Sequence, residues 1–394
     1  MQGRIRLARR YEHITALQRL RLLLGGVVVG ILAGGAIVVS LGRDPISVYW
    51  AMLRSAFETA DGFNGVLTAA TPLLLTGLAA LVAFKSGLYN IGAQGQLYFG
   101  AIAASGVSLY VHDASPAILV IASVMAGAAG GILWMAVPAI ARVYLGVSEI
   151  LTTLMLNYIG GFVLVYLIFN SDSFWRNTQG SLAKAYPEGK FIPTGAYWPP
   201  LKFVGIQVPL GLLIGLSLCI GMWILYRWLR IGYIARLVGE APNVATYGGI
   251  TWSRVALLIL ITSGGLAGIA GASQIGDFAH SLVPTSLEAT NFGYTGILVA
   301  VLAMLEPLGI VLAAFGVGII ANAGLVLLGP GFPDGLGGTL EGVILLAVVL
   351  TMAGEYYRIS YVRADAAGLQ TIEDTVATGD DSSRDYGEWR QSAL

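Results

Sequence analysis

Long apolar runs alternate with short polar stretches along most of this 394-residue chain. A membrane-spanning helix needs about 20 mostly apolar residues. The run near 294–305 is short and stops at Glu306-Pro307, which predicts a partial or broken helix. We therefore expect an all-α polytopic membrane protein with about ten transmembrane helices, some broken, near residues 22–41, 66–84, 91–111, 117–138, 150–169, 208–226, 255–275, 294–305, 308–328 and 339–357.

Composition supports a chain embedded in the lipid bilayer. Hydrophobic residues make up 56% and charged residues 11%, whereas a soluble domain has roughly 25% charged residues. The single cysteine, Cys219, cannot form an internal disulfide. The length of the chain is therefore used for many spans and not for several soluble domains.

The distribution of basic residues predicts the orientation. Residues 1–21 are rich in arginine, and basic segments flanking the spans stay in the cytoplasm. Ten spans would return the C-terminus to the same side, so both termini are expected to be cytoplasmic. The transmembrane domain then covers 22–362, with an outer loop at 170–205 and a cytoplasmic loop at 227–253. The polar, acidic segment 363–394 is predicted to be a disordered cytoplasmic tail.

Several chemistries have no sequence support. None of the four lysines follows the glycines of a phosphate-binding loop, so no ATPase site is expected in this chain. The three histidines are far apart and HExxH is absent, so we expect no catalytic or metal site. The acids near spans, Glu149, Glu306 and Glu341, lie at predicted ends. This argues against an ion-coupled carrier with ionisable groups at mid-membrane depth, but leaves it open.

The stretch FKSGLYNIGAQGQLYFG, residues 84–100, is polar and glycine-rich between two apolar runs. Irregular backbone within a membrane is tolerated only where protein or a water-filled cavity surrounds it. We therefore expect a helix break whose amides, Asn90, Gln94 and Gln96, line or gate a translocation path. The alternative is that these amides tie helices together, each bond contributing about 0.6–2 kcal/mol.

Two further segments offer candidates for the same path. In SEILTTLMLNY, Ser148 suits a helix N-cap, and Glu149 complements the positive helix N-terminus. Asn157 and Tyr158 lie about two turns deeper and are predicted to line the path, as is Gln274 near the end of the 255–275 run. Hydrogen bonding between helices is again the alternative.

The segment GEAPNVATYGGI, residues 239–250, predicts a short helix. Pro242 suits its first turn, and Gly248-Gly249 would end it. A short helix on the cytoplasmic side, flanked by arginines, is suited to lie in a groove on another protein. A membrane-surface turn is the alternative interpretation.

The outer loop is rich in aromatic residues, among them Trp175, Tyr197 and Trp198. Aromatic side chains are enriched at protein interfaces, so we expect an external protein to dock there. Anchoring of tryptophan and tyrosine at the membrane interface explains the same pattern equally well.

Several motifs together resemble one family. SGLYNIGAQGQ (86–96), GVSEILTTLMLNYI (146–159), GEAPNVATYGGI (239–250) and SGGLAGIAGASQIG (263–276) resemble permease subunits of bacterial ABC importers for simple sugars, branched-chain amino acids and nucleosides. The resemblance extends from about Thr71 to Leu350. It is closest to nucleoside-type permeases, which have NIGAEGQ, a similar GVNEV motif and a long loop with FIPTG. Gln94 departs from their usual glutamate and Ser148 from their asparagine.

The resemblance implies a translocation subunit and not an enzyme. Segment 239–250 would be the coupling helix for separate ATPase subunits, which carry ATP and Mg, through Gly239, Glu240, Pro242, Asn243, Ala245 and Gly249. Further partners would be an external substrate-binding lipoprotein and a second permease, a paralogue or a second copy; no nucleic acid is expected. The protein would span the bacterial cytoplasmic membrane many times and take up nucleosides by alternating access. Sugar or branched-chain amino acid uptake is the alternative within the family.

Overall fold

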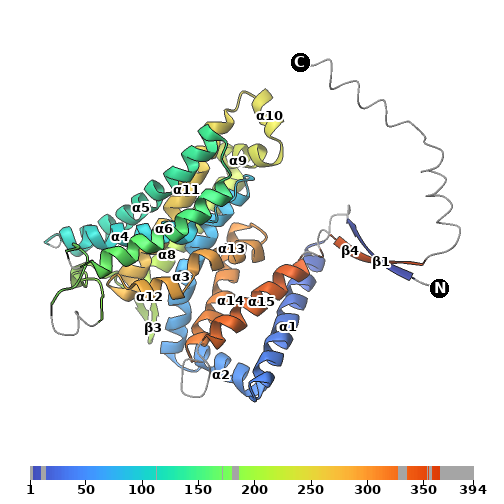
Figure 1. The fold of residues 1–394 in the computed structure, drawn as a ribbon, viewed down its shortest axis with the longest axis horizontal. Coiled ribbons are helices and arrows are strands. Elements are labelled where there is room, and N and C mark those ends of the chain that lie inside the picture. The colour runs from blue at the N-terminus through green and yellow to red at the C-terminus, as the bar shows by residue number, and fades with distance from the viewer. Residues whose placement is uncertain are drawn as a thin grey trace. The chain divides into compact units, whose positions relative to one another are not determined.

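The computed structural model describes residues 3–9, 15–111, 113–170, 172–179, 186–326, 335–352, 354 and 357–363. The chain divides into two compact units, Met1–Gly26 with Leu350–Leu394, and Val27–Val349. Most of the described chain is helical, as Figure 1 shows. The predicted tail beyond Arg363 lies outside the described residues, as does His112.

Helices occur at all ten predicted apolar runs. Among the described residues, seven segments are long and apolar enough to cross a membrane, the longest being Pro116–Leu145. The helices at the ten runs are α1 (Ala16–Ser40), α3 (Ala60–Phe84), α4 (Ala93–Tyr110), α5 (Pro116–Leu145), α6 (Glu149–Phe169), α8 (Leu210–Trp228), α11 (Trp252–Ser273), α13 (Phe292–Leu302), α14 (Pro307–Val326) and α15 (Leu336–Met352).

The core of the larger unit is built around α3 and α11. Both helices are mostly buried, whereas α6 and α8 leave most of their surface exposed. Glycines allow α11 to approach its neighbours closely, because an added Cβ on Gly268 would clash with the backbone of Gly127 and Gly131 on α5. Close backbone packing of this kind holds helices together in lipid, where the hydrophobic effect between helices is absent.

The short run at 294–305 forms one 11-residue helix, α13, which ends at Leu302 before Glu306-Pro307, and a break that was not predicted precedes it. The chain continues from α11 through a π-helical turn, η2 (Gln274–Ala279), to the short α12 (Pro284–Ala289) and then to α13. Asn291, between α12 and α13, has a left-handed backbone with φ of 47°. The prediction of a partial helix at 294–305 is confirmed by the short length of α13, whereas the break at Asn291 was not predicted.

Some elements were not predicted. Asp44 caps α2 (Pro45–Phe57) by accepting hydrogen bonds from the N–H groups of Ile46 and Ser47. The outer loop contains a 3₁₀ turn, η1 (Thr194–Ala196), and a hairpin of β2 (Leu201–Phe203) and β3 (Ile206–Val208). Strand β1 (Gly3–Arg9) pairs antiparallel with β4 (Tyr357–Arg363). The all-α prediction is therefore right for the apolar runs but misses two small sheets.

Candidate functional site

The first part of the site is the break between α3 and α4. Helix α3 ends at Phe84 and α4 begins at Ala93, so the predicted break is confirmed. Asn90, at its centre, is fully buried. Its Nδ2 donates to Gln96 Oε1 and to Ser263 Oγ, both at 2.8 Å, and its Oδ1 accepts from the Gly92 N–H at 2.9 Å and from Gln96 Nε2 at 3.0 Å. The paired amides are thus satisfied entirely by protein.

Asn157 closes the same break from α6. Its Oδ1 accepts from the Gly95 N–H at 2.8 Å, and its Nδ2 donates to the Ile91 carbonyl at 2.9 Å. A second bond runs from Nδ2 to the Tyr294 hydroxyl on α13 at 3.1 Å. Buried backbone groups that lack a helical partner need such side chains, so Asn157 stabilises the irregular backbone before α4.

Gln94 performs the same task at the second break, between α12 and α13. Its Oε1 accepts from the Gly293 N–H at 2.6 Å, and its Nε2 donates to the Leu287 carbonyl at 3.1 Å. The Nε2 also donates to the Tyr98 hydroxyl at 3.0 Å. A single buried side chain on α4 therefore joins the end of α12 to the start of α13.

Among the described residues, the side chains of the other two predicted path residues make no hydrogen bond to these networks. Tyr158 is 60% exposed on the outer face of α6. Gln274 is buried at the first position of η2. The contacts of the four buried amides, Asn90, Gln94, Gln96 and Asn157, favour the alternative that amides tie helices together. Lining of a path by the six residues stays a prediction.

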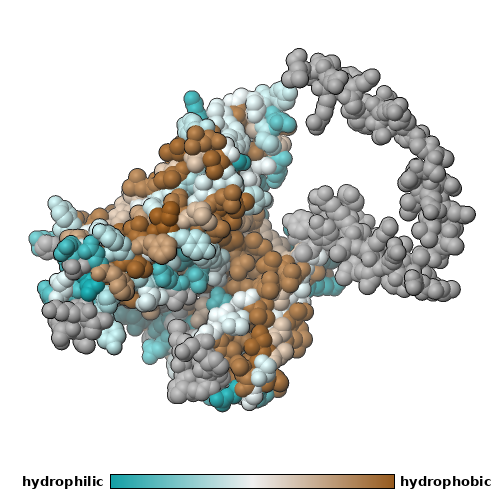
Figure 2. Space-filling view, in the orientation of Figure 1, coloured by the Kyte–Doolittle hydropathy of each residue, from teal (hydrophilic) through white to brown (hydrophobic). Residues whose placement is uncertain are grey.

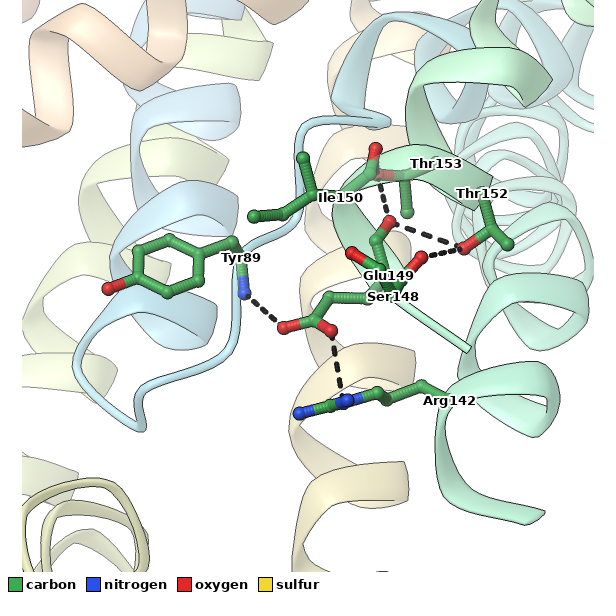
Figure 3. Close-up of polar contacts among 7 residues, drawn as sticks. All are labelled: Tyr89, Arg142, Ser148, Glu149, Ile150, Thr152 and Thr153. Atoms are coloured by element: carbon green, nitrogen blue, oxygen red, sulfur yellow. Dashed lines mark hydrogen bonds and ion pairs between the residues drawn. The ribbon is translucent and has the colours of Figure 1, made fainter. Parts of the chain in front are cut away.

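A carboxylate connects the first break to the junction of α5 and α6 (Figure 3). Glu149 is almost fully buried. Its Oε1 accepts from the Tyr89 N–H at 3.2 Å, and its Oε2 lies 3.0 Å from Arg142 Nε at the end of α5. Ser148 occupies the predicted N-cap position but makes no capping bond with its side chain. Glu149 therefore pairs with Arg142, in addition to its predicted favourable interaction with the positive N-terminus of α6.

The predicted coupling segment forms a helical hairpin, α9 (Arg230–Glu240) followed by α10 (Pro242–Tyr247). The predicted bounds of the short helix are confirmed, with Gly249 in a left-handed turn at φ of 76°. Ala245 is 1% exposed and faces inward, whereas Val244 is 58% and Tyr247 93% exposed. The exposed face of α10 is therefore formed by Val244 and Tyr247, which were not predicted as coupling residues. Their apolar character within a polar loop was a signal that could have identified them.

The remaining predicted coupling residues lie around the hairpin. Glu240, Pro242, Asn243 and Gly249 are exposed. Gly239, at the end of α9, packs directly on the first break, because a Cβ added to it would lie 2.5 Å from the carbonyl carbon of Ser86. On the other side of this contact, Gly87 has a left-handed backbone with φ of 69°. The hairpin and the break thus touch through backbone, and the contact requires glycine.

The predicted aromatic residues of the outer loop fasten it to the helices. Trp198 is buried, and its Nε1 donates to Ser123 Oγ on α5 at 2.9 Å. Trp175 Nε1 donates to the Ile102 carbonyl on α4 at 3.2 Å. Tyr197 stacks on His280 with ring centroids 3.6 Å apart, and burial lowers the pKa of His280. Docking of an external protein by these residues stays a prediction. Among the described residues of the loop, the exposed aromatics are instead Phe174, Tyr186, Phe191 and Phe203.

Sequence reasoning also missed a buried acid, Asp277 in η2. Its Oδ1 accepts from the Leu210 N–H at 3.1 Å, and its Oδ2 accepts from the Gly211 N–H at 2.9 Å. These are unsatisfied donors of the first turn of α8, where the preceding Pro209 makes no side-chain cap. Asp277 therefore caps α8 from another helix, a role that no local sequence pattern could reveal.

Within the described residues, no three His, Cys, Asp or Glu side chains come together as a possible metal site. The site is an arrangement of hydrogen-bonded helix breaks, one buried ion pair and an exposed hairpin. Such an arrangement is suited to transmitting movement between elements.

Comparison with known proteins gives a consistent picture. Residues 62–351 match the model of the permease component of branched-chain amino acid transport systems. The nucleoside ABC transporter permease NupB of Lactococcus lactis is 28% identical over 90% of this chain and 96% of its own length. The guanosine ABC transporter permease NupP of Bacillus subtilis is 29% identical over 85% and 93%. The glucose ABC transporter permease TsgB13 of Haloferax volcanii is 27% identical over 90% and 93%.

The family match covers most of the apolar helices, both helix breaks and the α9–α10 hairpin. It agrees with the resemblance of the sequence motifs and with seven helices suited to cross a membrane among the described residues. The chain therefore belongs to the family of permease components of branched-chain amino acid-type transport systems, and it is a multi-pass membrane translocation subunit and not an enzyme.

Proposed function

We propose that this chain is the permease of an ABC importer that takes up nucleosides. Family membership supports the importer, and the names of NupB and NupP, which align with most of the chain, support the substrate. TsgB13, a permease named for glucose, aligns over a similar length and supports sugar uptake as the second candidate.

The α9–α10 hairpin supports a coupling role. Its α10 helix presents Val244 and Tyr247 outward, while Gly239 packs on the first helix break. A helix with an exposed apolar face fits into a groove on a partner protein. In this proposal, separate ATPase subunits bind ATP and Mg and contact α10. Movement of α10 is then transmitted through the hairpin to the break at residues 85–92. The break is in turn held to α6 by Glu149 and Asn157.

The same proposal includes ten membrane crossings, with both termini in the cytoplasm of a bacterial cell. Pairing of β1 with β4 supports a common side for the two ends. A second permease, either a paralogue or another copy, would complete the path, and an external lipoprotein would deliver the nucleoside. An ion-coupled carrier is the alternative from another class.

Uptake of labelled guanosine by cells with and without this gene, with its partner subunits expressed, tests the proposed function. We expect gene-dependent uptake that excess nucleoside reduces and excess glucose or leucine does not. Inhibition by glucose would favour the second candidate. Inhibition by an uncoupler with no effect of vanadate would favour an ion-coupled carrier.

The docking role of α10 is tested by Tyr247→Arg. We expect this variant to reach the membrane at normal levels but to lose co-purification with the ATPase subunits. The matched control is Tyr110→Arg. Tyr110 is 80% exposed and is the last residue of α4, at the end of that helix away from the first break. Ala245→Arg is unsuitable because Ala245 is buried. Undiminished co-purification of Tyr247→Arg would contradict docking through this face.

A further inference from the structure

Glu288, on α12, places a carboxylate beside the middle of a membrane helix. Helix α12 packs against α6, and Glu288 Oε1 would lie 3.4 Å from a Cβ added to Gly161. Gly161 is about 18 Å along α6 from its first residue and about 12 Å from its last, at 1.5 Å per residue. The carboxylate therefore lies near mid-height of a helix that is long enough to span the bilayer.

This carboxylate is exposed. In the part of the chain that the structure describes, it receives no hydrogen bond or ion pair, and it lies close enough to the Tyr98 hydroxyl to interact with it electrostatically. Ionisable groups at membrane depth avoid lipid and face the protein interior or a water-filled cavity. An exposed, unpaired carboxylate at this height therefore indicates that the surface formed by α6 and α12 borders water and not lipid.

The surroundings of Glu288 combine hydroxyl groups with aromatic rings. Tyr158 and Phe162 are 60% and 73% exposed, one turn apart on α6. The hydroxyls of Tyr158 and Tyr294 interact electrostatically, and that of Tyr294 accepts a bond from Asn157. We call Glu288, Tyr158, Phe162 and Tyr294 the Glu288 face. In Figure 2, hydrophilic residues interrupt the apolar surface in the region where Figure 1 places α12 beside α6.

The Glu288 face lies at a discontinuity of the backbone. Asn291, three residues after Glu288, has a left-handed conformation between α12 and α13. In membrane transporters, solute sites typically lie near the bilayer midplane where helices are interrupted. The helix break, the exposed Glu288 and the exposed aromatic rings thus all indicate a solute site at the Glu288 face.

We propose that the Glu288 face is the solute-binding surface of the translocation path. The Glu288 carboxylate accepts hydrogen bonds from the vicinal ribose hydroxyls of a nucleoside, and the rings of Tyr158 and Phe162 stack on the base. Carboxylates form the stronger, charge-assisted class of hydrogen bond, and aromatic stacking tolerates different bases. The identity of the solute in this inference rests on the proposed function. The exposure of the Glu288 face to water is independent of the proposed function.

Labelling with a hydrophilic maleimide tests exposure to water. The wild-type chain is the blank, because its only cysteine, Cys219, is buried. Leu312→Cys is the control, since Leu312 is a 78% exposed apolar residue on α14. In the intact transporter in lipid nanodiscs, we expect Glu288→Cys to react at least about tenfold faster than Leu312→Cys, because the thiolate that reacts does not form in apolar surroundings. Equally slow reaction would overturn the inference, since lipid or a second permease would then cover the face.

Selectivity for the ribose hydroxyls tests the ligand. We compare uptake of guanosine with that of 2′,3′-dideoxyguanosine. The control is Glu58→Gln, which removes an exposed carboxylate that follows α2 and pairs with Arg54. Glu288→Gln should lower guanosine uptake about five- to tenfold and leave the dideoxy analogue nearly unchanged. Equal loss for both solutes, or no loss, would overturn the role of Glu288 in binding. Absence of nucleoside uptake by the wild-type transporter would instead refute the proposed function, and labelling would still decide whether the face borders water.

Discussion

Gln94 offers a sharp test of how the second helix break is stabilised. Its amide accepts from the Gly293 N–H, in the first turn of α13, and donates to the Leu287 carbonyl of α12, which also accepts from the Thr290 hydroxyl. In Gln94→Leu the side chain keeps a similar size, but the Gly293 N–H loses its partner and the Leu287 carbonyl keeps only the bond from the Thr290 hydroxyl. The Tyr98 hydroxyl also loses a donor.

The expected cost follows from these three lost bonds. A buried backbone group left without a partner costs about 1–3 kcal/mol, and side-chain hydrogen bonds within membranes average about 0.6 kcal/mol each. We therefore expect Gln94→Leu to lower the free energy of unfolding by about 2–4 kcal/mol. Gln94→Glu should cost less, because a carboxylate still accepts from Gly293 although it cannot donate to Leu287.

Reversible unfolding by SDS in mixed micelles measures these differences. Gln207→Leu, at an exposed glutamine in β3, is the matched control and should stay within about 0.5 kcal/mol of the wild type. If Gln94→Leu also stayed within this range, or if Gln94→Glu were the less stable of the two Gln94 variants, the assigned bridging of the break would be wrong.

Three further substitutions test other contacts with the same unfolding assay. Arg142→Gln should lower the free energy of unfolding by about 1–3 kcal/mol, because it leaves the buried Glu149 carboxylate without its cation. Adding Glu149→Gln should recover part of this loss. Fully additive effects of the two substitutions would show that the pair does not interact. Asp277→Ala should cost about 1–2 kcal/mol through loss of the α8 cap, and unchanged stability would mean that the cap contributes nothing. Trp198→Phe should cost about 1 kcal/mol through the lost bond to Ser123 and speed proteolysis of the outer loop, whereas unchanged proteolysis would contradict its anchoring role.

The positions of the apolar helices could be predicted because transfer into lipid depends mainly on residue type and run length. Local signals also located α10, since Pro242 and Gly248-Gly249 act on the backbone beside them. The break after Phe84 followed from glycines and amides concentrated between apolar runs. Strand β1 escaped prediction because a short strand is stable only with its partner, and β4 lies at the other end of the chain.

The side-chain partners were decided by tertiary structure alone. The sequence indicated that Asn90, Gln94 and Asn157 needed polar surroundings, but left open whether protein or a path supplied them. Their bonds join residues that are distant along the chain, such as Gln94 and Gly293. The inward position of Ala245 likewise depends on how α10 packs.

The sequence by itself determined that this chain is a multi-span membrane protein with a helix break within 84–100 and a short helix at 242–247, because hydropathy and backbone preference are local properties; the permease role came from the resemblance of its motifs to a known family. Only the tertiary structure decided which amides close the breaks, which face of α10 is exposed and where Glu288 lies. Hydrogen bonds and burial depend on groups brought together from several helices, and no single segment encodes that proximity.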